Sequence, residues 1–209
     1  MTRTLAILLF NDVEVLDFAG PFEVFSTTGQ NEGQQPFQVC TVAETLEPIL
    51  ARNQLSINPQ YTLDTCPHPD IVLVPGGGGY RETGEPYGTR REMDNPIILD
   101  WVTSRAQNTE VLLSVCTGAL ILAKAGLLDG LSATTHFQAM DNLRELAPHT
   151  QVLAGDRIVD NGHIILSAGI SAGIDMALYV VAKLLSPSDA IKTATYMEYD
   201  WRHPLAVQT

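Results

Sequence analysis

The sequence predicts an α/β fold in which a mostly parallel β-sheet carries helices on both faces. Three short apolar runs, at residues 5–10, 71–74 and 111–115, have the pattern of strands buried on both faces, and such strands belong to parallel sheets. Stretches with the helical spacing of apolar side chains alternate with these runs, which is typical of a doubly wound sheet. The 209 residues are 45% hydrophobic and show no internal repeat or linker, so we expect one domain over residues 1–209.

The segment between the first two apolar runs is expected to hold a short helix, a strand and a hairpin. A helix with Pro21 in its first turn should end near Gly29. Residues 37–43 alternate between apolar and polar side chains in the manner of a strand. The arms of a small hairpin are expected at residues 48–50 and 55–57.

The second apolar run leads directly into Pro75 and four glycines at residues 76–79. Glycines in this position permit a tight approach of the backbone to another group. Residues 80–95 are polar and without periodicity, so we expect a long surface loop there. A helix is predicted at residues 96–106 from the spacing of its apolar side chains.

The third apolar run is followed at once by a helix of small residues, predicted at residues 118–125. The rest of the chain is expected to form a strand end at 133–135, a helix at 137–146, a hairpin of residues 157–159 and 163–167, and an apolar helix at 174–185. Ser186 and Asp189 are expected to cap a final helix.

Composition and charge exclude several classes of function. A net charge of -12 without a basic stripe repels polyphosphate, so we expect no nucleic-acid partner. No apolar stretch of ~18 residues occurs and no cleavage-like site follows the first run, so we expect neither a membrane span nor secretion. Cys40, Cys66 and Cys116 are an odd number without close spacing. They suggest neither a disulfide framework nor a metal site, but reduced thiols in the cytoplasm.

Cys116 lies where a buried strand ends and a helix begins within about two residues. This arrangement predicts a nucleophile elbow with sulfur in place of oxygen. The helix N-terminus is expected to favour the thiolate, and ligands of open α/β sheets bind beyond the carboxyl ends of strands. We therefore expect Cys116 to be the catalytic nucleophile.

Asp17 follows the first expected strand, in a loop that opens at the same edge of the sheet. A carboxyl removed from water there can stay protonated and exchange its proton with the Cys116 thiol, which would make Asp17 the second catalytic residue. The alternative is that Asp17 caps the following helix, and both roles can coexist.

Further candidates surround these two residues. The backbone N–H groups of Gly77 or Gly78, with that of Thr117, are expected to hold a developing negative charge. The glycine run lacks the Lys-Ser/Thr ending of a phosphate loop, so we reject nucleotide binding. His136 ends an expected strand and either reaches the pocket or is a structural residue. No Gly-x-Ser-x-Gly motif supports a serine hydrolase, and Cys40 and Cys66 are expected to be structural.

Five segments of the chain together resemble the ThiJ/PfpI superfamily, which is also called class I glutamine amidotransferase-like. They are LLFNDVEVLDFAGPFEVF, VLVPGGGG, SVCTGALILAKAGLLDG, ATTHF and GISAGIDMAL. The resemblance implies a flavodoxin-like fold and a homodimer. The Asp in LDFAGP with CTG and TTH looks most like the isocyanide hydratase branch and the related sensor domains of AraC-type regulators.

For the hydratase branch, the resemblance implies a lyase that adds water to a small isocyanide substrate to give an N-formamide, without metal or organic cofactor. The nucleophile and the acid/base would fall on Cys116 and Asp17, and Thr117 would support the site through its N–H, its hydroxyl, or both.

The chain departs from this pattern at several positions. Thr117 stands where the protease-like branch has His, which disfavours peptidase activity. Phe137 replaces the Trp of the hydratase branch, residues 198–203 replace its tail, and the segment at 80–95 is longer, so a different lid and substrate are expected.

Two alternatives to the isocyanide reaction remain open. One is a glyoxalase-like or deglycase-like enzyme for small carbonyls, although that branch carries Glu at the position of Asp17. The other is a non-catalytic ligand or redox sensor. Such a sensor would not act on DNA itself, because no helix-turn-helix extension precedes Thr209.

Overall fold

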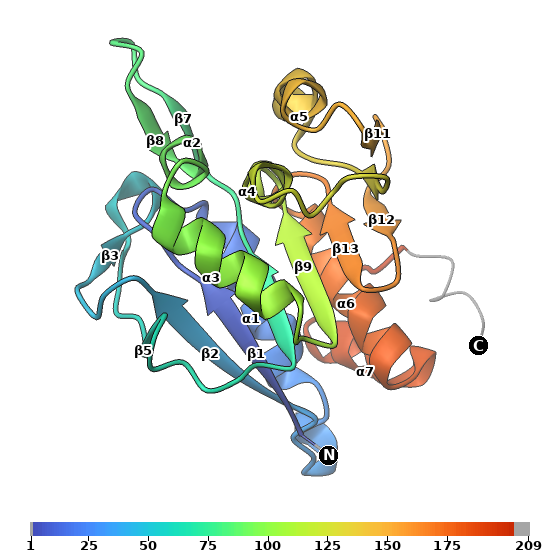
Figure 1. Cartoon of the computed structure of the whole chain (residues 1–209). Coiled ribbons are helices and arrows are strands. Elements are labelled where there is room, and N and C mark those ends of the chain that lie inside the picture. Colours follow the sequence, from blue (N-terminus) through green and yellow to red (C-terminus); the bar gives the residue numbers. More distant parts are fainter. Residues whose placement is uncertain (1, 203–209) are drawn as a thin grey trace.

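The computed structural model describes residues 2–202, and a seven-stranded sheet runs through its centre (Figure 1). Its strand order is β12-β13-β9-β6-β1-β2-β5, and every pairing is parallel except that of β12 with β13. Its strands are β1 (Arg3–Leu8), β2 (Phe37–Ala43), β5 (Tyr61–Thr62), β6 (Ile71–Val74), β9 (Val111–Val115), β12 (Ile158–Asp160) and β13 (Ile164–Ser167). Residue 1 and residues 203–209 lie outside the described range, so the last residue of the segment 198–203 is not described.

Helices cover both faces of this sheet, as the sequence predicts. One face carries α1 (Val15–Thr27), α6 (Ala172–Leu184) and α7 (Pro187–Tyr196). The other carries α3 (Pro96–Ala106) and α4 (Gly118–Lys124), and α5 (Met140–Leu146) packs on α4 beyond the carboxyl edge of the sheet. Strands β6 and β9 are buried along their whole length between the two layers, which explains their continuous apolar sequences. The doubly wound fold is therefore confirmed.

Several elements have the predicted positions. The small hairpin forms from β3 (Ile49–Leu50) and β4 (Ser56–Ile57), and β12 pairs with β13 as the second hairpin. Ser186 caps α7, because its hydroxyl accepts a hydrogen bond from the Asp189 N–H at 3.2 Å. Short 3₁₀ turns occur at η1 (Gln30–Glu32), η2 (Arg52–Gln54) and η3 (Phe137–Ala139). Among the helices of residues 2–202, none has the length and apolar content that crossing a bilayer requires.

Helix α1 begins at Val15, more than one turn before Pro21, so the prediction that Pro21 lies in the first turn is wrong. Pro21 therefore lies inside the helix, where it removes one backbone hydrogen-bond donor. Packing against α6 compensates for this loss: a Cβ added at Gly20 would lie only 2.8 Å from Ile174 Cγ1. The earlier start puts Asp17 in the first turn of a helix and corrects its expected position in a loop.

The expected long loop at residues 80–95 is a hairpin followed by a helical turn. Strands β7 (Gly78–Tyr80) and β8 (Pro86–Gly88) pair in antiparallel fashion, and α2 (Thr89–Glu92) follows. A Cβ at Gly78, whose φ is +79°, would lie 2.6 Å from the Gly88 Cα, so the two backbones meet only because both residues are glycines. The glycines that suggest a loop in the sequence therefore allow the hairpin to form. The hairpin extends beyond the carboxyl edge of the sheet (Figure 1).

The strand end expected at residues 133–135 is not part of the main sheet. Strand β10 (Ser132–Ala133) pairs instead with β11 (Gln151–Val152) in a separate two-stranded sheet. Thr134 and Thr135 then leave it with buried hydroxyls that bond to the carbonyls of Asp156 and Cys116. His136 therefore does not end a strand of the main sheet.

Candidate active site

Cys116 occupies the turn between β9 and α4, so the predicted elbow is confirmed. Its φ of +57° lies in the left-handed region, which costs a residue with a side chain about 1 to 2 kcal/mol. Hydrogen bonds to the N–H and to the carbonyl of Cys116 hold the turn in place. The Cys116 N–H donates to the carbonyls of Ser167 and Ala168, both at 3.2 Å, and its carbonyl accepts from Thr135 Oγ1 at 2.8 Å. Backbone strain at a site fixed in this way is typical of functional residues.

Two glycines allow the end of β6 to approach this turn. A Cβ at Gly118 would lie 2.2 Å from the Val74 carbonyl oxygen. A Cβ at Gly76 would lie 2.5 Å from the Thr117 nitrogen and 2.9 Å from Asp17 Oδ2. A side chain at either position would push the end of β6 away from the elbow, and one at Gly76 would also displace the Asp17 carboxyl.

The side chain of Asp17 is fully buried and faces the elbow. Its Oδ2 accepts a hydrogen bond from the Gly76 N–H at 3.0 Å. The Cys116 thiol and the Ile170 N–H also interact with the carboxyl, while Oδ1 has no hydrogen bond of standard geometry within residues 2–202. The capping alternative for Asp17 is wrong, because the N-cap position of α1 belongs to Glu14 and the Asp17 carboxyl bonds outside its own helix.

Burial controls the proton affinity of both groups. It raises the pKa of Asp17 to about 7, against the opposing hydrogen bond from Gly76. Burial and the neighbouring Asp17 carboxylate raise the pKa of Cys116 to about 12. The expectation that the helix terminus lowers the pKa of this thiol is therefore wrong, since burial and a like charge outweigh the N–H groups at the elbow. The pair loses one proton near pH 7 and a second near pH 12, and between these values it holds one proton and one negative charge.

Two backbone N–H groups point to the sulfur of Cys116. They belong to Thr117, as predicted, and to Ile170, which sequence analysis missed. Ile170 has a φ of +56° and precedes α6, so its N–H contacts both the thiol and the Asp17 carboxyl. The segment follows β13, the neighbour of β9 in the sheet, and only that strand order places Ile170 at the elbow.

Gly77 does not have the role that its position suggests. Its N–H donates to Thr117 Oγ1 at 3.0 Å and is therefore not available to a developing negative charge. The Thr117 hydroxyl is also bonded to Thr89 Oγ1 at 3.1 Å. Gly78 belongs to β7 and lies opposite Gly88, and the role of its N–H in holding a developing negative charge stays a prediction.

His136 lies beside this centre. Its Nδ1 accepts from the Gln138 N–H at 3.3 Å, and a Cβ at Gly169 would lie 2.2 Å from its Cδ2, so the ring packs on the backbone next to Ile170. Burial and the positive charges of Arg90 and Arg52 lower its pKa. No hydrogen bond joins it to Cys116 or Asp17 within the described residues. Its ring forms one wall of a cavity of about 470 Å³, and a role in the reaction stays a prediction.

The other two cysteines are neighbours, although their spacing in the sequence gives no sign of it. The thiols of Cys40, in β2, and Cys66 interact with each other, which raises the pKa of Cys40 and lowers that of Cys66. Both are buried and free. Within residues 2–202, no group of three or more His, Cys, Asp or Glu side chains is arranged to hold a metal ion.

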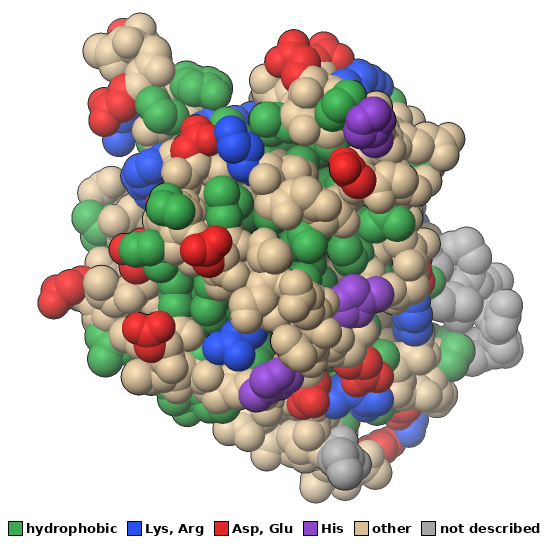
Figure 2. Space-filling view, viewed as in Figure 1, with side chains coloured by type: hydrophobic (Ala, Val, Ile, Leu, Met, Phe, Trp, Pro, Cys, Tyr) green, Lys and Arg blue, Asp and Glu red, His purple; other side chains and the backbone are tan. Residues whose placement is uncertain are grey.

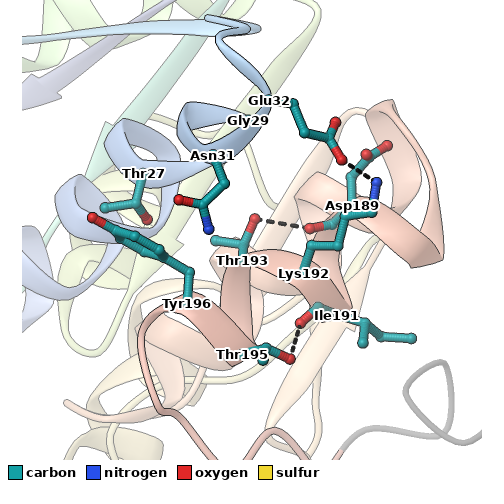
Figure 3. A pocket seen from close by; sticks show the side chains of 10 residues that line it. All are labelled: Thr27, Gly29, Asn31, Glu32, Asp189, Ile191, Lys192, Thr193, Thr195 and Tyr196. Atoms are coloured by element: carbon teal, nitrogen blue, oxygen red, sulfur yellow. Dashed lines mark hydrogen bonds and ion pairs between the residues drawn. The ribbon is translucent and has the colours of Figure 1, made fainter.

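A separate cavity of about 300 Å³ lies between η1 and α7 and contains none of the candidate residues (Figure 3). Its polar side chains are largely engaged. Thr193 and Thr195 bond to backbone carbonyls of their own helix, and Lys192 forms an ion pair with Glu32. The candidate active site is therefore the group of residues around Cys116 at the carboxyl edge of the sheet.

Comparisons with known proteins agree with this description. The model of the DJ-1/PfpI family matches residues 3–183. The isonitrile hydratase of Pseudomonas putida is 33% identical over 199 residues, which cover 95% of this chain and 79% of the hydratase. The HTH-type transcriptional regulator CdhR of Pseudomonas aeruginosa is 32% identical over 147 residues, which cover 70% of this chain but only 40% of the regulator.

Solved structures show the same fold. A ThiJ/PfpI family protein from Pseudomonas syringae superposes with a TM-score of 0.83 at 28% identity and covers all of this chain and 80% of its own. Drosophila melanogaster DJ-1beta gives a TM-score of 0.78 at 18% identity, with 96% of this chain and all of its own covered.

Proposed function

The chain belongs to the DJ-1/PfpI family, and we propose that it is a cysteine enzyme of that family that adds water to an isocyanide and releases an N-formamide. The observation that carries this proposal is the buried contact between the Cys116 thiol and the Asp17 carboxyl. Such a pair can move one proton between sulfur, oxygen and a substrate atom without water. The 33% identity with an isonitrile hydratase supports the choice of reaction.

The first step joins the thiol to the terminal carbon of the isocyanide. Above pH 7 Asp17 is a carboxylate and Cys116 a thiol, so Asp17 takes the thiol proton as the sulfur attacks. The new S–C bond leaves an electron pair on that carbon, and Asp17 delivers the same proton to it. The product is a thioimidate in which carbon carries hydrogen, sulfur and a double bond to nitrogen.

Water then completes the addition. Its oxygen bonds to the thioimidate carbon and one of its protons goes to nitrogen, with Asp17 carrying the proton between them. When the C–S bond breaks, the second proton returns to sulfur and the N-formamide leaves. The N–H groups of Thr117 and Ile170 would stabilise negative charge on sulfur during attack and departure. The sum of these steps is the addition of one water molecule to the isocyanide without net oxidation or reduction, so the proposed lyase reaction needs no cofactor.

The Thr117 hydroxyl has a positioning role in this proposal. It is already bonded to the Gly77 N–H and to Thr89 Oγ1, so it holds the glycine turn against the elbow. Only its backbone N–H would act on the reacting sulfur. The contribution of Gly77 is then to fix the turn and not to bind the substrate.

A sensor function is the second candidate, because CdhR, named as a transcriptional regulator, is 32% identical to this chain. In a sensor the same cavity would bind a small molecule without turnover. A glyoxalase-like enzyme is less favoured, since Asp17 is one methylene shorter than the Glu expected in that branch.

The proposed setting of the protein is the cytoplasm, as a homodimer of single-domain chains that acts on a small molecule and has no nucleic-acid or membrane partner. The free cysteines support a cytoplasmic setting, and the net charge of -12 supports the absence of a nucleic-acid partner. The homodimer rests on the family resemblance, and sedimentation equilibrium of the purified chain tests it.

The reaction itself is tested by incubating the purified chain with an alkyl isocyanide and detecting the N-formamide by NMR. We expect turnover by the wild type and a loss of about 10³-fold or more in Cys116→Ser. Conversion of methylglyoxal without hydration of isocyanides would instead identify the carbonyl enzyme. Binding of an isocyanide without turnover would identify the sensor.

A further inference from the structure

Arg90 is a buried positive charge without a partner. Its residue is 9% exposed, and no hydrogen bond or ion pair reaches its guanidinium within residues 2–202. The next residue, Arg91, differs: its side chain is 40% exposed, and its guanidinium pairs with Asp12 and Glu92. A guanidinium in a largely buried residue favours an anionic partner, and the five N–H donors of Arg90 have no protein partner within residues 2–202.

The guanidinium lines a cavity of about 190 Å³. This cavity is lined by Tyr80, Arg90 and Met93, by Leu120 of α4, and by residues of α5. Figure 2 shows the surface hollowed between the β7–β8 hairpin and α5, where these elements meet. The cavity is about six water molecules in volume, enough for one small group.

Two short connections link this cavity to the elbow at Cys116. The residue before Arg90 is Thr89, whose hydroxyl bonds to that of Thr117, next to Cys116. Leu120 lies in the first turn after the elbow and donates its N–H to the Thr117 carbonyl. Arg90 and Cys116 also interact electrostatically, so the guanidinium lies close enough to the sulfur for their charges to affect each other.

We propose that Arg90 determines substrate specificity by binding a carboxylate on the isocyanide substrate while the isocyanide carbon reaches Cys116. This assignment rests on the proposed hydration of isocyanides. The planar guanidinium matches a carboxylate through two parallel hydrogen bonds, and Met93 and Leu120 offer apolar contact to the short chain between the two groups. The natural substrate is thus an isocyano acid of a few carbon atoms.

Glu145 favours a ligand with one negative charge over a ligand with two. It reaches the same cavity from α5 but is exposed and forms no ion pair with Arg90 within the described residues. Its negative charge at the rim disfavours a doubly charged group such as a phosphate. A single carboxylate satisfies Arg90 with the least repulsion from Glu145, and Glu145→Gln is expected to strengthen the binding of such an anion.

The experiment compares isocyanoacetate with its neutral methyl ester as substrates of the wild type, Arg90→Gln and Arg90→Lys. We expect the ratio of the two kcat/KM values, acid over ester, to fall by about 10²-fold in Arg90→Gln and by less in Arg90→Lys. Arg91→Gln removes the same charge from the same helix but not from the cavity, and should leave the ratio near that of the wild type. Equal losses for both substrates in Arg90→Gln, or no loss, would overturn the proposal.

A second measurement does not depend on hydratase activity. Iodoacetate and iodoacetamide alkylate thiols and differ mainly in charge, so the ratio of their rates at Cys116 at pH 9 reports an anion site beside the sulfur. We expect this ratio to exceed that of free cysteine in the wild type and to fall below it in Arg90→Gln, where the Asp17 carboxylate remains as the charge beside the sulfur. Absence of isocyanide turnover with a raised ratio would reject the proposed reaction and keep the anion site. A wild-type ratio equal to that of free cysteine would reject the site itself, whether or not Arg90→Gln folds.

Discussion

The carboxyl of Asp17 contacts the thiol of Cys116 although the two residues are about a hundred positions apart in the chain. Asp17 projects from the first turn of α1, after β1, and Cys116 forms the elbow after β9. Strand β6 lies between β1 and β9, and its glycine end holds the carboxyl through the Gly76 N–H. Four predictions concern this contact.

The first prediction is a stability that falls as the pH rises. The pKa of Asp17 is raised from 3.8 to about 7 in the folded chain, so the folded state binds this proton more tightly than the unfolded state. Its stabilising contribution is complete below pH 4 and is lost as the pH passes through 7. Between pH 5 and pH 8 the loss is roughly 3 kcal/mol in the free energy of unfolding. Urea unfolding at both pH values should show this difference in the wild type and not in Asp17→Asn; the same pH dependence in both proteins would assign it to other groups.

The second prediction concerns the reactivity of the thiol. With a pKa near 12, Cys116 is almost entirely a thiol at pH 8, and iodoacetamide should label it more slowly than free cysteine. Asp17→Asn removes a negative charge that raises this pKa and should accelerate labelling. Peptide mapping by mass spectrometry separates Cys116 from Cys40 and Cys66. Labelling of wild-type Cys116 faster than free cysteine at pH 7 would show that the elbow stabilises the thiolate after all.

The third prediction uses two glycines of the same run. Gly76→Ala would place a Cβ 2.5 Å from the Thr117 nitrogen and 2.6 Å from its Oγ1, so the elbow must move. Gly79→Ala is the control, because its Cβ would meet only the Tyr87 ring and hydroxyl, at 3.5 Å or more. We expect Gly76→Ala to lose most of the isocyanide turnover and several degrees in Tm, and Gly79→Ala to keep both. Equal behaviour of the two variants would show that the close approach at Gly76 is unimportant.

Local sequence could predict those parts of the molecule that local forces determine. Strands β6 and β9 are continuous apolar runs between turn residues. Helix α3 begins after Asn95, whose side chain accepts a hydrogen bond from the Ile97 N–H. The bounds of all three elements therefore follow from the sequence. The elbow at Cys116 belongs to the same class, because an apolar strand ends there and small helical residues follow.

The features that the sequence predicts wrongly, or does not predict, depend on contacts between distant segments. Gly78 and Gly88 form a hairpin by packing against each other, and the N–H of Ile170 reaches the elbow only because β13 lies beside β9. Arg90 gives no local signal, since a polar residue in a polar segment is normally exposed. The sequence predicts a lowered pKa for Cys116 because the helix terminus is visible in the sequence, whereas the burial of the thiol and its contact with the Asp17 charge are not.

The fourth prediction is the most direct test of proton transfer between Asp17 and Cys116: the turnover of an isocyanide by Asp17→Asn and Asp17→Glu, measured beside their melting curves. Asn fills the same space and still accepts from the Gly76 N–H but carries no proton to the substrate carbon, so kcat should fall by about 10²-fold or more while the variant stays folded. Glu retains the proton one methylene away and should recover part of the loss. Wild-type turnover by a folded Asp17→Asn variant would contradict the account and leave Cys116 acting without the carboxyl.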